Sequence, residues 1–554
     1  MGLYLNSKKP CVIYENLAHS TYFIDKTAML EELIPLVGQA GGCAAQDARK
    51  EGGGNKYICV TRPRRFGKTS AACMAASFFG KGSDCRGLFQ KLQVGKNSLF
   101  EAHLNKHNVI YIPFNEIPMD CASYRQYIDR IQERLMSDLR RDFPQVDTGG
   151  ALWDVLNEIY ELEEDVKFIF VLDEWDYIFH RSFVTEKDRP AYIDFLSGLL
   201  KDQPYVELAY MTGILPIAKY SSGSELNMFY EYTMATEEKY SSFFGFTEDE
   251  VDVLYKKYQK IHQRPKITRR ELQVWYDGYH IRSGGRVYNP RSVIAALTNN
   301  NLGNYWTSAG PYDEIYYYIE QNTDAVREDI ARMASGAAVP SGIREYAATA
   351  MNLSTREEIF SAMVVYGFLT YENGCVSIPN RELMDKFQQV LMREPSLGYV
   401  YRLCVNSGKM LKATKACDVD TMAELLAYAH DTEVPLFNYN EEVDLAAVVN
   451  LVYLSARDSY EVAREDKGGI GYVDFIFKPF RNRGDDCIIL ELKVDGTPEE
   501  AIRQIKEKKY ALAFSPKLGT PPIYTGRILA VGIAYDRKTK RHSCRIEIWE
   551  NSVE

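Results

Sequence analysis

The sequence predicts an α/β protein made of three successive parts. In residues 1–225, short runs of apolar and β-branched residues alternate with helical patterns, which is typical of a parallel sheet built from βαβ units. Residues 226–435 show mainly helical patterns with little strand content. From residue 436 to residue 554, strand and helix patterns mix again, which predicts a second α/β domain. With 554 residues, the chain is long enough to give each part a core of its own.

Composition and charge narrow the class of protein. The chain is 46% hydrophobic and 26% charged, as in ordinary globular proteins. Its net charge of -10 argues against a surface coated with basic residues, so any contact with nucleic acid must be local. No apolar run approaches the ~18 residues of a membrane span. The 11 cysteines lack the spacing of a zinc site. We therefore expect a cytoplasmic protein with reduced thiols and no membrane partner.

The elements of the first part can be placed individually. Strands are expected at residues 57–61, 109–114, 168–172 and 206–212, and helices at residues 70–79, 124–139, 151–160 and 191–200. Thr27 is expected to cap a short amphipathic helix, and the glycine-rich stretch 37–55 to form a surface loop. The carboxyl ends of parallel strands share one edge of a sheet, which is where such folds bind ligands.

The first chemical motif is Arg-Pro-Arg-Arg-Phe-Gly-Lys-Thr-Ser at residues 62–70, between the first strand and a helix. In a phosphate-binding loop of this order, amides at the helix N-terminus face the anion, a lysine adds positive charge and a hydroxyl ligates Mg²⁺. The general motif has glycine where this chain has Arg62, and Gly-Lys-Thr alone is common by chance. We predict an ATP site. Its expected ligands in the loop are Arg64, Arg65, Phe66, Gly67, Lys68, Thr69 and Ser70.

An acidic pair, Asp173 and Glu174, follows the third strand and would lie at the same edge of the sheet. Asp173 would hold Mg²⁺ together with Thr69, and Glu174 would polarise the attacking water during γ-phosphate hydrolysis. The alternative is an ordinary strand that ends in a solvated acidic turn. Thr212, at the end of the fourth strand, would face the γ-phosphate, or would simply begin the turn at Gly213.

The middle part contains an aromatic cluster that has two interpretations. It comprises Trp-Tyr-Asp-Gly-Tyr-His at residues 275–280, Tyr-Asn-Pro at 288–290 and Asn-Tyr-Trp at 304–306. Such rings can stack on nucleic-acid bases. More often they pack a small helical core, and this second interpretation is the one that we favour.

The third part contains charged residues within a strongly apolar strand, Cys-Ile-Ile-Leu-Glu-Leu-Lys-Val at residues 487–494. Glu491 and Lys493 are two residues apart and so project from one face. Together with Asp474 from a neighbouring strand, they suit a Mg²⁺-dependent phosphodiesterase, with Asp474 and Glu491 as metal ligands. Gln504, on the helix expected from residue 498, would point into this site. The alternative is an edge strand whose charges are merely solvated.

Motifs along the chain resemble the bacterial AAA-ATPase-like proteins that carry a C-terminal PD-(D/E)XK nuclease domain. The matching stretches are residues 22–27, 61–69, 171–174, 212–215, 246–251, 275–279, 288–290, 304–306, 471–474 and 490–493, with Gln504 and Tyr510.

The resemblance implies an AAA-like P-loop ATPase domain over residues 1–225, a helical lid or linker over 226–435 and a restriction-endonuclease-like domain over 436–554. It implies ATP and Mg²⁺ at the first site, and catalytic Asp474, Glu491 and Lys493 at the second, where Mn²⁺ is an alternative metal. It also implies that arginine in place of the first glycine, as at Arg62, is usual in the loop of this family. At the second site, it implies that Glu441 or Glu442 supplies a further acidic residue.

We therefore expect an ATPase that controls a nuclease, acting on DNA in preference to RNA, with self-association as an open alternative. A second hypothesis is a nucleotide-switched sensor whose inactive nuclease-like domain only binds nucleic acid or a partner. A third is an ATPase that acts on protein partners.

Overall fold

The computed structural model describes most of the chain. The described residues are 2–38, 55–147, 149–163, 166–217, 225–234, 237–306, 323–334, 336–343, 355–392, 399–431, 442–467, 472–479, 482–514 and 524–549. The chain forms two compact units, one made of residues 1–314 and 340–383, the other of residues 315–339 and 384–554. Domain boundaries after residues 225 and 435 stay a prediction.

The first unit is built on a parallel five-stranded sheet with the order β2-β3-β4-β1-β5. The strands are β1 (Tyr57–Thr61), β2 (Asn108–Pro113), β3 (Phe168–Asp173), β4 (Val206–Gly213) and β5 (Tyr230–Tyr232). Because β4 lies between β1 and β3, the loop after β1 and the acidic pair after β3 are separated by one strand only. This sheet is that of a P-loop NTPase.

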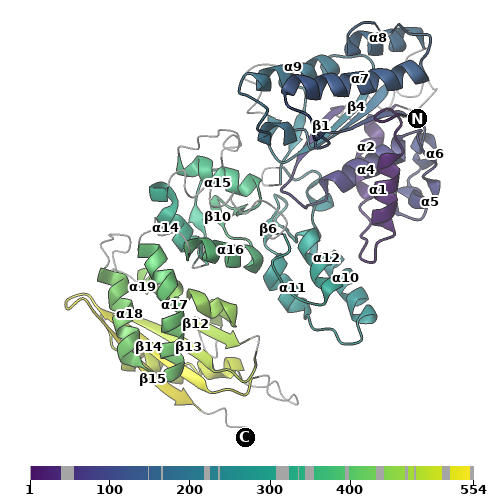
Figure 1. The fold of residues 1–554 in the computed structure, drawn as a ribbon. Helices are drawn as coiled ribbons and strands as arrows, with labels where there is room; N and C mark the ends of the chain where they lie inside the picture. The colour runs from purple at the N-terminus through teal and green to yellow at the C-terminus, as the bar shows by residue number, and fades with distance from the viewer. Residues whose placement is uncertain are drawn as a thin grey trace. The chain divides into compact units, whose positions relative to one another are not determined.

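Helices cover both faces of this sheet, and the alternation of side chains along each strand explains why. In β3, Phe168, Phe170 and Leu172 belong to one buried cluster, while Ile169 and Val171 belong to the other. The first cluster packs against α7 (Tyr124–Asp142), α8 (Leu152–Leu162) and α9 (Asp188–Leu200), and the second against α1 (Lys9–Ala18), α2 (Ala28–Leu33) and α4 (Lys68–Phe79) (Figure 1). Both faces are therefore apolar, as the continuous hydrophobic runs predicted.

The predicted strands and helices of this part are confirmed, within a few residues at their ends. Two differences have physical reasons. Thr27 stands at the N-cap of α2, but its hydroxyl donates to Asp25 and does not cap the helix. The three-residue strand β5 was not predicted, because its pattern is too short to be recognised without its partner β1. Most of the glycine-rich stretch, residues 39–54, lies outside the described residues.

The helical middle region has the character that its patterns predicted. Its helices include α10 (Glu248–Ile261), α11 (Arg269–Tyr276), α12 (Pro290–Asn299) and α15 (Arg356–Val365). Three of them begin with a capping box, at Thr247, Thr268 and Thr355. The remaining described elements here are β6 (Tyr279–His280), β7 (Arg286–Val287), α14 (Thr323–Ala334), β8 (Val339–Pro340), β9 (Thr370–Glu372), β10 (Cys375–Ser377) and α16 (Arg381–Leu391).

The aromatic cluster of the middle region packs a core, as the favoured interpretation predicted. Tyr276, Tyr279 and Tyr288 are at most 1% exposed, and Trp275 and Trp306 are at most 8% exposed. Rings buried to this extent cannot stack on nucleic-acid bases. Some of their polar atoms bind within the unit: the Tyr276 hydroxyl donates to the carbonyl of Gly303.

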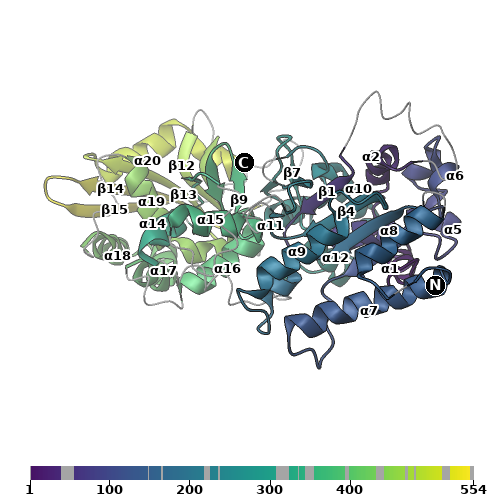
Figure 2. The ribbon, with the colours of Figure 1, turned by 90° about the horizontal axis from the view of Figure 1, so that it is seen from above.

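The second unit contains a mixed five-stranded sheet with the order β11-β12-β13-β14-β15. Only β13 and β14 are parallel, and α20 connects them. Figure 2 shows α20 on one side of this sheet and α17 and α18 on the other. The elements are α17 (Tyr399–Ala416), α18 (Val419–Asp431), α19 (Glu442–Val452), β11 (Tyr460–Lys467), β12 (Tyr472–Pro479), β13 (Cys487–Val494), α20 (Pro498–Glu507), β14 (Ile528–Asp536) and β15 (Arg541–Trp549).

The position of β13 decides between the two interpretations of its charged residues. It pairs with β12 on one side and β14 on the other, so it is an interior strand, and the edge-strand alternative is wrong. The sheet is that of a restriction-endonuclease-like domain. Among the described residues, no helix has both the length and the apolar character needed to cross a membrane.

Gly532 makes the close packing of α20 on this sheet possible. A Cβ atom at Gly532 would lie 2.4 Å from the carbonyl oxygen of Pro498 and 3.1 Å from Cβ of Ala501. We expect Gly532→Ala to lower the stability of the second unit by about 1–3 kcal/mol, because α20 must move away from the sheet. Differential scanning calorimetry of the full chain measures the loss as a lower transition temperature.

A matched substitution should have the opposite sign. Gly408 lies inside α17, and a Cβ atom there would meet no atom within 4 Å. Gly408→Ala should therefore stabilise the helix by about 0.5–1 kcal/mol. Equal transition temperatures for Gly532→Ala and wild type would contradict the packing argument.

Candidate functional sites

The phosphate loop connects β1 to α4 through a backbone with two left-handed positions. Arg65 has φ 70° and Gly67 has φ 94°, and α4 begins directly afterwards at Lys68. Glycine adopts such angles without cost, whereas a residue with a Cβ atom does not. The strained conformation of Arg65 is of the kind that concentrates at ligand-binding turns.

The amides of this loop are left available for a ligand. Among the described residues, the amides from Arg65 to Thr69 donate to no backbone carbonyl. Five consecutive amides at a helix N-terminus form a concave, positively polarised surface that suits an anion. The geometry is therefore that of a phosphate cradle.

Lys68 lies against the same loop. Its Nζ donates to the carbonyl oxygens of Arg62 (2.8 Å) and Pro63 (2.9 Å), and the residue is 6% exposed. Burial lowers the pKa of this ammonium to about 8, although Asp176, Glu174 and Asp173 favour its charged form. A phosphate group would give this buried cation the compensating charge that the protein supplies only in part.

Asp173 is completely buried at the end of β3, with one oxygen paired and one not. The Thr212 hydroxyl donates to Oδ1 at 2.6 Å. Oδ2 is buried and accepts no hydrogen bond of normal geometry from the described residues. Burial raises the pKa of this carboxyl, while the hydroxyls of Thr212 and Thr69 and the charge of Lys68 lower it. A buried carboxylate oxygen without a donor fits a hard cation such as Mg²⁺.

Glu174 has a strained backbone and a partner that the sequence did not reveal. Its φ is 55°, and its amide points toward the Thr212 hydroxyl at 3.4 Å. Burial and the neighbouring Asp173 raise the pKa of Glu174, while Lys68 and a hydrogen bond from Asn115 lower it. Asn115 follows β2, so its position at the same edge of the sheet was the one signal that could have identified it.

Two side chains of the loop, those of Arg62 and the predicted ligand Phe66, turn away from the cradle. Arg62 is 1% exposed, and its guanidinium donates to the carbonyls of Thr61 and Tyr232, both at 2.7 Å. Burial lowers the pKa of Arg62 to about 9. Phe66 packs edge-on against Tyr279, 4.9 Å between ring centroids. Arg62 therefore ties β1 to β5, and Phe66 can offer a ligand only its backbone.

The other predicted loop residues are more accessible. Arg65 is exposed, whereas Arg64, Thr69 and Ser70 are half-buried. The carbonyl of Arg64 accepts from Nε1 of Trp306 at 3.1 Å.

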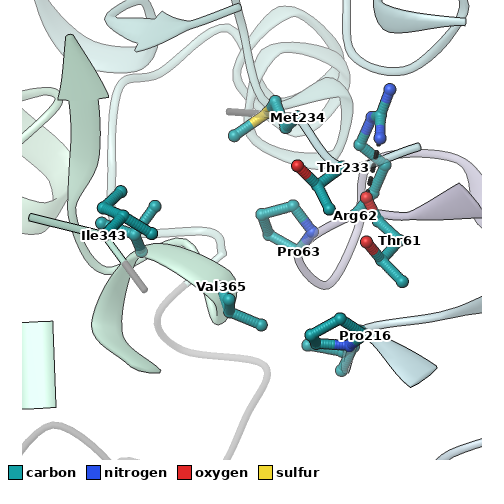
Figure 3. Close-up of a pocket in the computed structure, with 10 residues that line it drawn as sticks. Thr61, Arg62, Pro63, Pro216, Thr233, Met234, Ile343 and Val365 are labelled. Atoms are coloured by element: carbon teal, nitrogen blue, oxygen red, sulfur yellow. Dashed lines mark hydrogen bonds between the residues drawn. The ribbon is translucent and has the colours of Figure 1, made fainter. Parts of the chain in front are cut away.

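An apolar hollow lies beside the start of the loop (Figure 3). Arg62 is the one charged residue among those that line it. A hollow of this character suits an apolar or aromatic group and not a phosphate. Its lining is Thr61, Arg62, Pro63, Ile214, Pro216, Thr233, Met234, Ile343, Val364 and Val365.

The second site brings Asp474 and Glu491 together, as the spacing predicted. The antiparallel register of β12 and β13 pairs Phe475 with Leu490, so the next position sets Asp474 opposite Glu491. Oδ2 of Asp474 accepts from the amide of Leu492 at 2.8 Å, and the amide of Asp474 points at Oε2 of Glu491 at 3.4 Å. Glu491 is 3% exposed. A carboxylate this deeply buried needs compensation, which a cation can supply.

Gln504 and Tyr510 both reach this site. Nε2 of Gln504 donates to Oε1 of Glu491. Along an uninterrupted helix, a spacing of six residues would turn Tyr510 about 240° away from Gln504, but α20 ends at Glu507. Lys509 then has φ 53°, which redirects the chain. Burial raises the pKa of Tyr510, a hydrogen bond with Gln504 lowers it, and the charges of Glu491 and Asp474 raise it.

Other predicted residues around the second site differ in their surroundings. Lys493 is half-buried on β13, two residues from Glu491. Two basic residues of this unit pair within the protein: Lys506 with Glu547 at 2.6 Å, and Arg537 with Asp495. The side chains of Glu441 and Glu442 lie outside the described residues.

Two carboxylates, Asp474 and Glu491, meet at this site in the part of the chain that the structure describes. Among the described residues, no group of three or more His, Cys, Asp or Glu side chains is arranged to hold a metal. Two carboxylates can suffice for Mg²⁺, which is usually bound through one or two carboxylates and otherwise by water and substrate phosphate oxygens.

Comparison with known families agrees with the two sites. Residues 50–222 match the family model of a predicted AAA-ATPase. Residues 441–542 match the model of the PD-(D/E)XK nuclease superfamily. The chain thus carries an AAA-ATPase-like domain followed by a PD-(D/E)XK nuclease superfamily domain, the architecture that its motifs predicted.

Solved structures are similar to this chain only at low identity. The Walker-type ATPase PABY2304 of Pyrococcus abyssi has 13% identity and a TM-score of 0.35, covering 66% of this chain and 94% of its own. The ORC2 protein of Aeropyrum pernix, in its ADPNP-ADP complexes, has 10% identity and a TM-score of 0.29, covering 60% and 87%. Neither TM-score is high enough to support a conclusion about this chain. No curated protein matches it.

The structural role of Arg62 can be tested by installing the glycine of the general motif. Arg62→Gly should destabilise the first unit by about 2–4 kcal/mol, because two carbonyls lose their donor and a cavity replaces the side chain. Arg65→Gly is the matched control, because glycine suits φ 70° at this position. It should change stability by less than about 1 kcal/mol. Calorimetry of the full chain measures both, and equal effects would contradict the assignment.

Proposed function

We propose that the chain binds and hydrolyses ATP in its first unit and, under the control of that reaction, cleaves nucleic acid in its second. The observation that carries this proposal is the pairing of two prepared sites on one chain. One offers free amides and a buried lysine to phosphates. The other sets two carboxylates and a lysine together in an otherwise apolar sheet.

At the first site, the residues have distinct roles. The amides from Arg65 to Thr69 and the ammonium of Lys68 bind the phosphates. Thr69 and Asp173 hold Mg²⁺, whose charge offsets that of the phosphates when it is bound. Glu174 orients the water that attacks the γ-phosphorus, and the bond to the β-γ bridging oxygen breaks to give ADP and phosphate. Thr212 acts through Asp173, because its hydroxyl is directed at that carboxylate.

At the second site, Asp474 and Glu491 would hold Mg²⁺ or Mn²⁺, which would supply positive charge for the phosphodiester. Lys493 positions the attacking water or stabilises the negative phosphate oxygens. Gln504 orients Glu491. The proposed reaction is hydrolysis of a phosphodiester bond, and the proposed partner is nucleic acid, DNA in preference to RNA.

Two further proposals concern the protein as a whole. We place it in the cytoplasm, on the basis of its ordinary composition and of the cysteines that the structure describes, which form no disulfide. Self-association is included because the first site needs a cation opposite the γ-phosphate, which a second copy of the chain would supply. Arg64 and Arg65 are the candidates from the loop itself.

A second candidate is a nucleotide-switched binding protein with an inactive nuclease-like domain. The observation that favours it is that both carboxylates at the second site already accept hydrogen bonds from the protein, from Leu492 and Gln504. The two candidates differ in one measurable property, which is the binding of a divalent cation at Asp474 and Glu491.

One experiment tests the proposal directly. Wild type, Lys68→Ala, Asp474→Ala and Lys493→Ala are incubated with ATP, Mg²⁺ and single- and double-stranded DNA and RNA. We expect Asp474→Ala and Lys493→Ala to lose at least about 100-fold in cleavage while binding ATP normally, because they remove groups at the reacting phosphate. Lys68→Ala should lose ATP binding and with it the effect of ATP on cleavage. Gels and nucleotide-binding isotherms provide the measurements.

The matched control for this experiment is Glu507→Ala, which removes an exposed acid at the end of α20. It should cleave like wild type. Undiminished cleavage by both Asp474→Ala and Lys493→Ala would refute the nuclease. ATP binding without cleavage or metal binding by wild type would favour the second candidate.

Asn115 provides a separate prediction for the first site. The side-chain contact given for Asn115 among the described residues is with Glu174, so Asn115→Ala should lower kcat for ATP hydrolysis roughly tenfold and leave KM within about twofold. Asn299→Ala, at an exposed position on α12, is the control. A raised KM with unchanged kcat would show that Asn115 acts on binding instead.

A further inference from the structure

The carbonyl groups of the phosphate loop, on the side opposite its amides, also constrain the loop conformation. If the amides face a ligand, the carbonyls must face the protein, where each needs a donor. Nζ of Lys68 donates hydrogen bonds to the carbonyls of Arg62 and Pro63. The carbonyl of Phe66 accepts from the amide of Gly245 at 3.2 Å, and the carbonyl of Arg64 accepts from Nε1 of Trp306 at 3.1 Å.

The direction of a carbonyl fixes the direction of the next amide. Each peptide group is planar, and in the trans form its C=O and N–H point in opposite directions. The described residues contain no cis peptide bond. The donor on the Arg64 carbonyl therefore sets the direction of the Arg65 amide, and the donor on the Phe66 carbonyl sets that of the Gly67 amide.

Trp306 is itself held in place by a buried carboxylate. Its backbone amide donates to Oε1 of Glu382 at 2.5 Å, while the Ser292 hydroxyl donates to Oε2 at 2.7 Å. Glu382 is 2% exposed, and Trp306 is 7% exposed. The indole also packs against Phe368, 5.7 Å between ring centroids. Both the ring and the backbone of Trp306 are thus fixed before any ligand arrives.

We propose that Trp306 and Glu382 are positioning residues of the nucleotide site. Neither touches a nucleotide. Trp306 orients the peptide group between Arg64 and Arg65 so that its amide faces the phosphates, and Glu382 holds Trp306 at the distance where its indole N–H reaches that carbonyl. This inference rests on the proposed function of the first unit, and it adds a requirement: the middle region completes the phosphate cradle.

The decisive variant removes one N–H and little else. Trp306→Phe keeps an aromatic ring against Phe368 but leaves the Arg64 carbonyl without its donor. The dissociation constants of Mg·ATP and Mg·ADP should rise roughly tenfold, as expected when a buried acceptor is left unsatisfied. Inorganic pyrophosphate, which can use only the phosphate contacts, should displace a fluorescent ATP analogue less well by the same factor. A purely structural role would lower the melting temperature without this phosphate-specific loss.

Further variants separate positioning from folding. Trp153→Phe makes the same chemical change on α8 and should leave nucleotide affinity unchanged. Glu382→Gln keeps the oxygen that accepts from Trp306 and should retain most of the affinity, whereas Glu382→Leu should lose it as Trp306→Phe does. If Trp306→Phe does not fold, Glu382→Leu decides the question.

The outcomes distinguish this inference from the function on which it rests. Wild-type affinity for Mg·ATP in folded Trp306→Phe or folded Glu382→Leu overturns the inference. Failure of wild type to bind Mg·ATP, or equal binding by Lys68→Ala, overturns the proposed nucleotide site itself. Loss in Trp306→Phe together with retention in Glu382→Gln and Trp153→Phe supports the positioning role.

Discussion

The first site depends on one constraint: a loop can leave its amides free for a ligand only if its carbonyls find donors elsewhere. A buried carbonyl without a donor costs on the order of 1–3 kcal/mol. Here the donors are Lys68, at the end of the loop, and Gly245 and Trp306, which are distant from it in the sequence. The loop conformation is therefore a property of the whole unit, and the packing of the middle region contributes to a binding surface that it does not itself form.

The two sites use burial in complementary ways. In the first, the buried ammonium of Lys68 faces carboxylates that compensate its charge only in part, and the free amides add positive potential. A phosphate ligand bound together with a cation would suit this site. In the second, a buried carboxylate, Glu491, lies in an interior strand beside Asp474, and a bound cation would add to the charge compensation that the protein itself provides. Both sites thus hold buried charges whose burial costs free energy, and that cost would be lower with a ligand of opposite charge bound.

Local patterns were sufficient to predict the parts of each site that lie close together in the sequence. The loop 62–70, the pair after β3 and the Glu-Leu-Lys spacing on β13 are all readable from strand length and residue type. Asn115, Trp306 and Tyr510 were not assigned to a role, for different reasons. Asn115 depends on strand order and Trp306 on packing between distant segments. Tyr510 depends on where α20 ends, which a left-handed residue at Lys509 decides and periodicity cannot reveal.

Arg62 illustrates what a sequence motif encodes. The general motif asks for glycine at this position, but the residues with positive φ in this loop are Arg65 and Gly67, and Arg62 is not among them. A side chain at Arg62 therefore causes no backbone strain, and it is directed into the protein, where it joins β1 to β5. The strain appears instead at Arg65, at about 1–2 kcal/mol. The requirement is for a backbone whose amides converge, and a chain can meet it with arginine where another uses glycine.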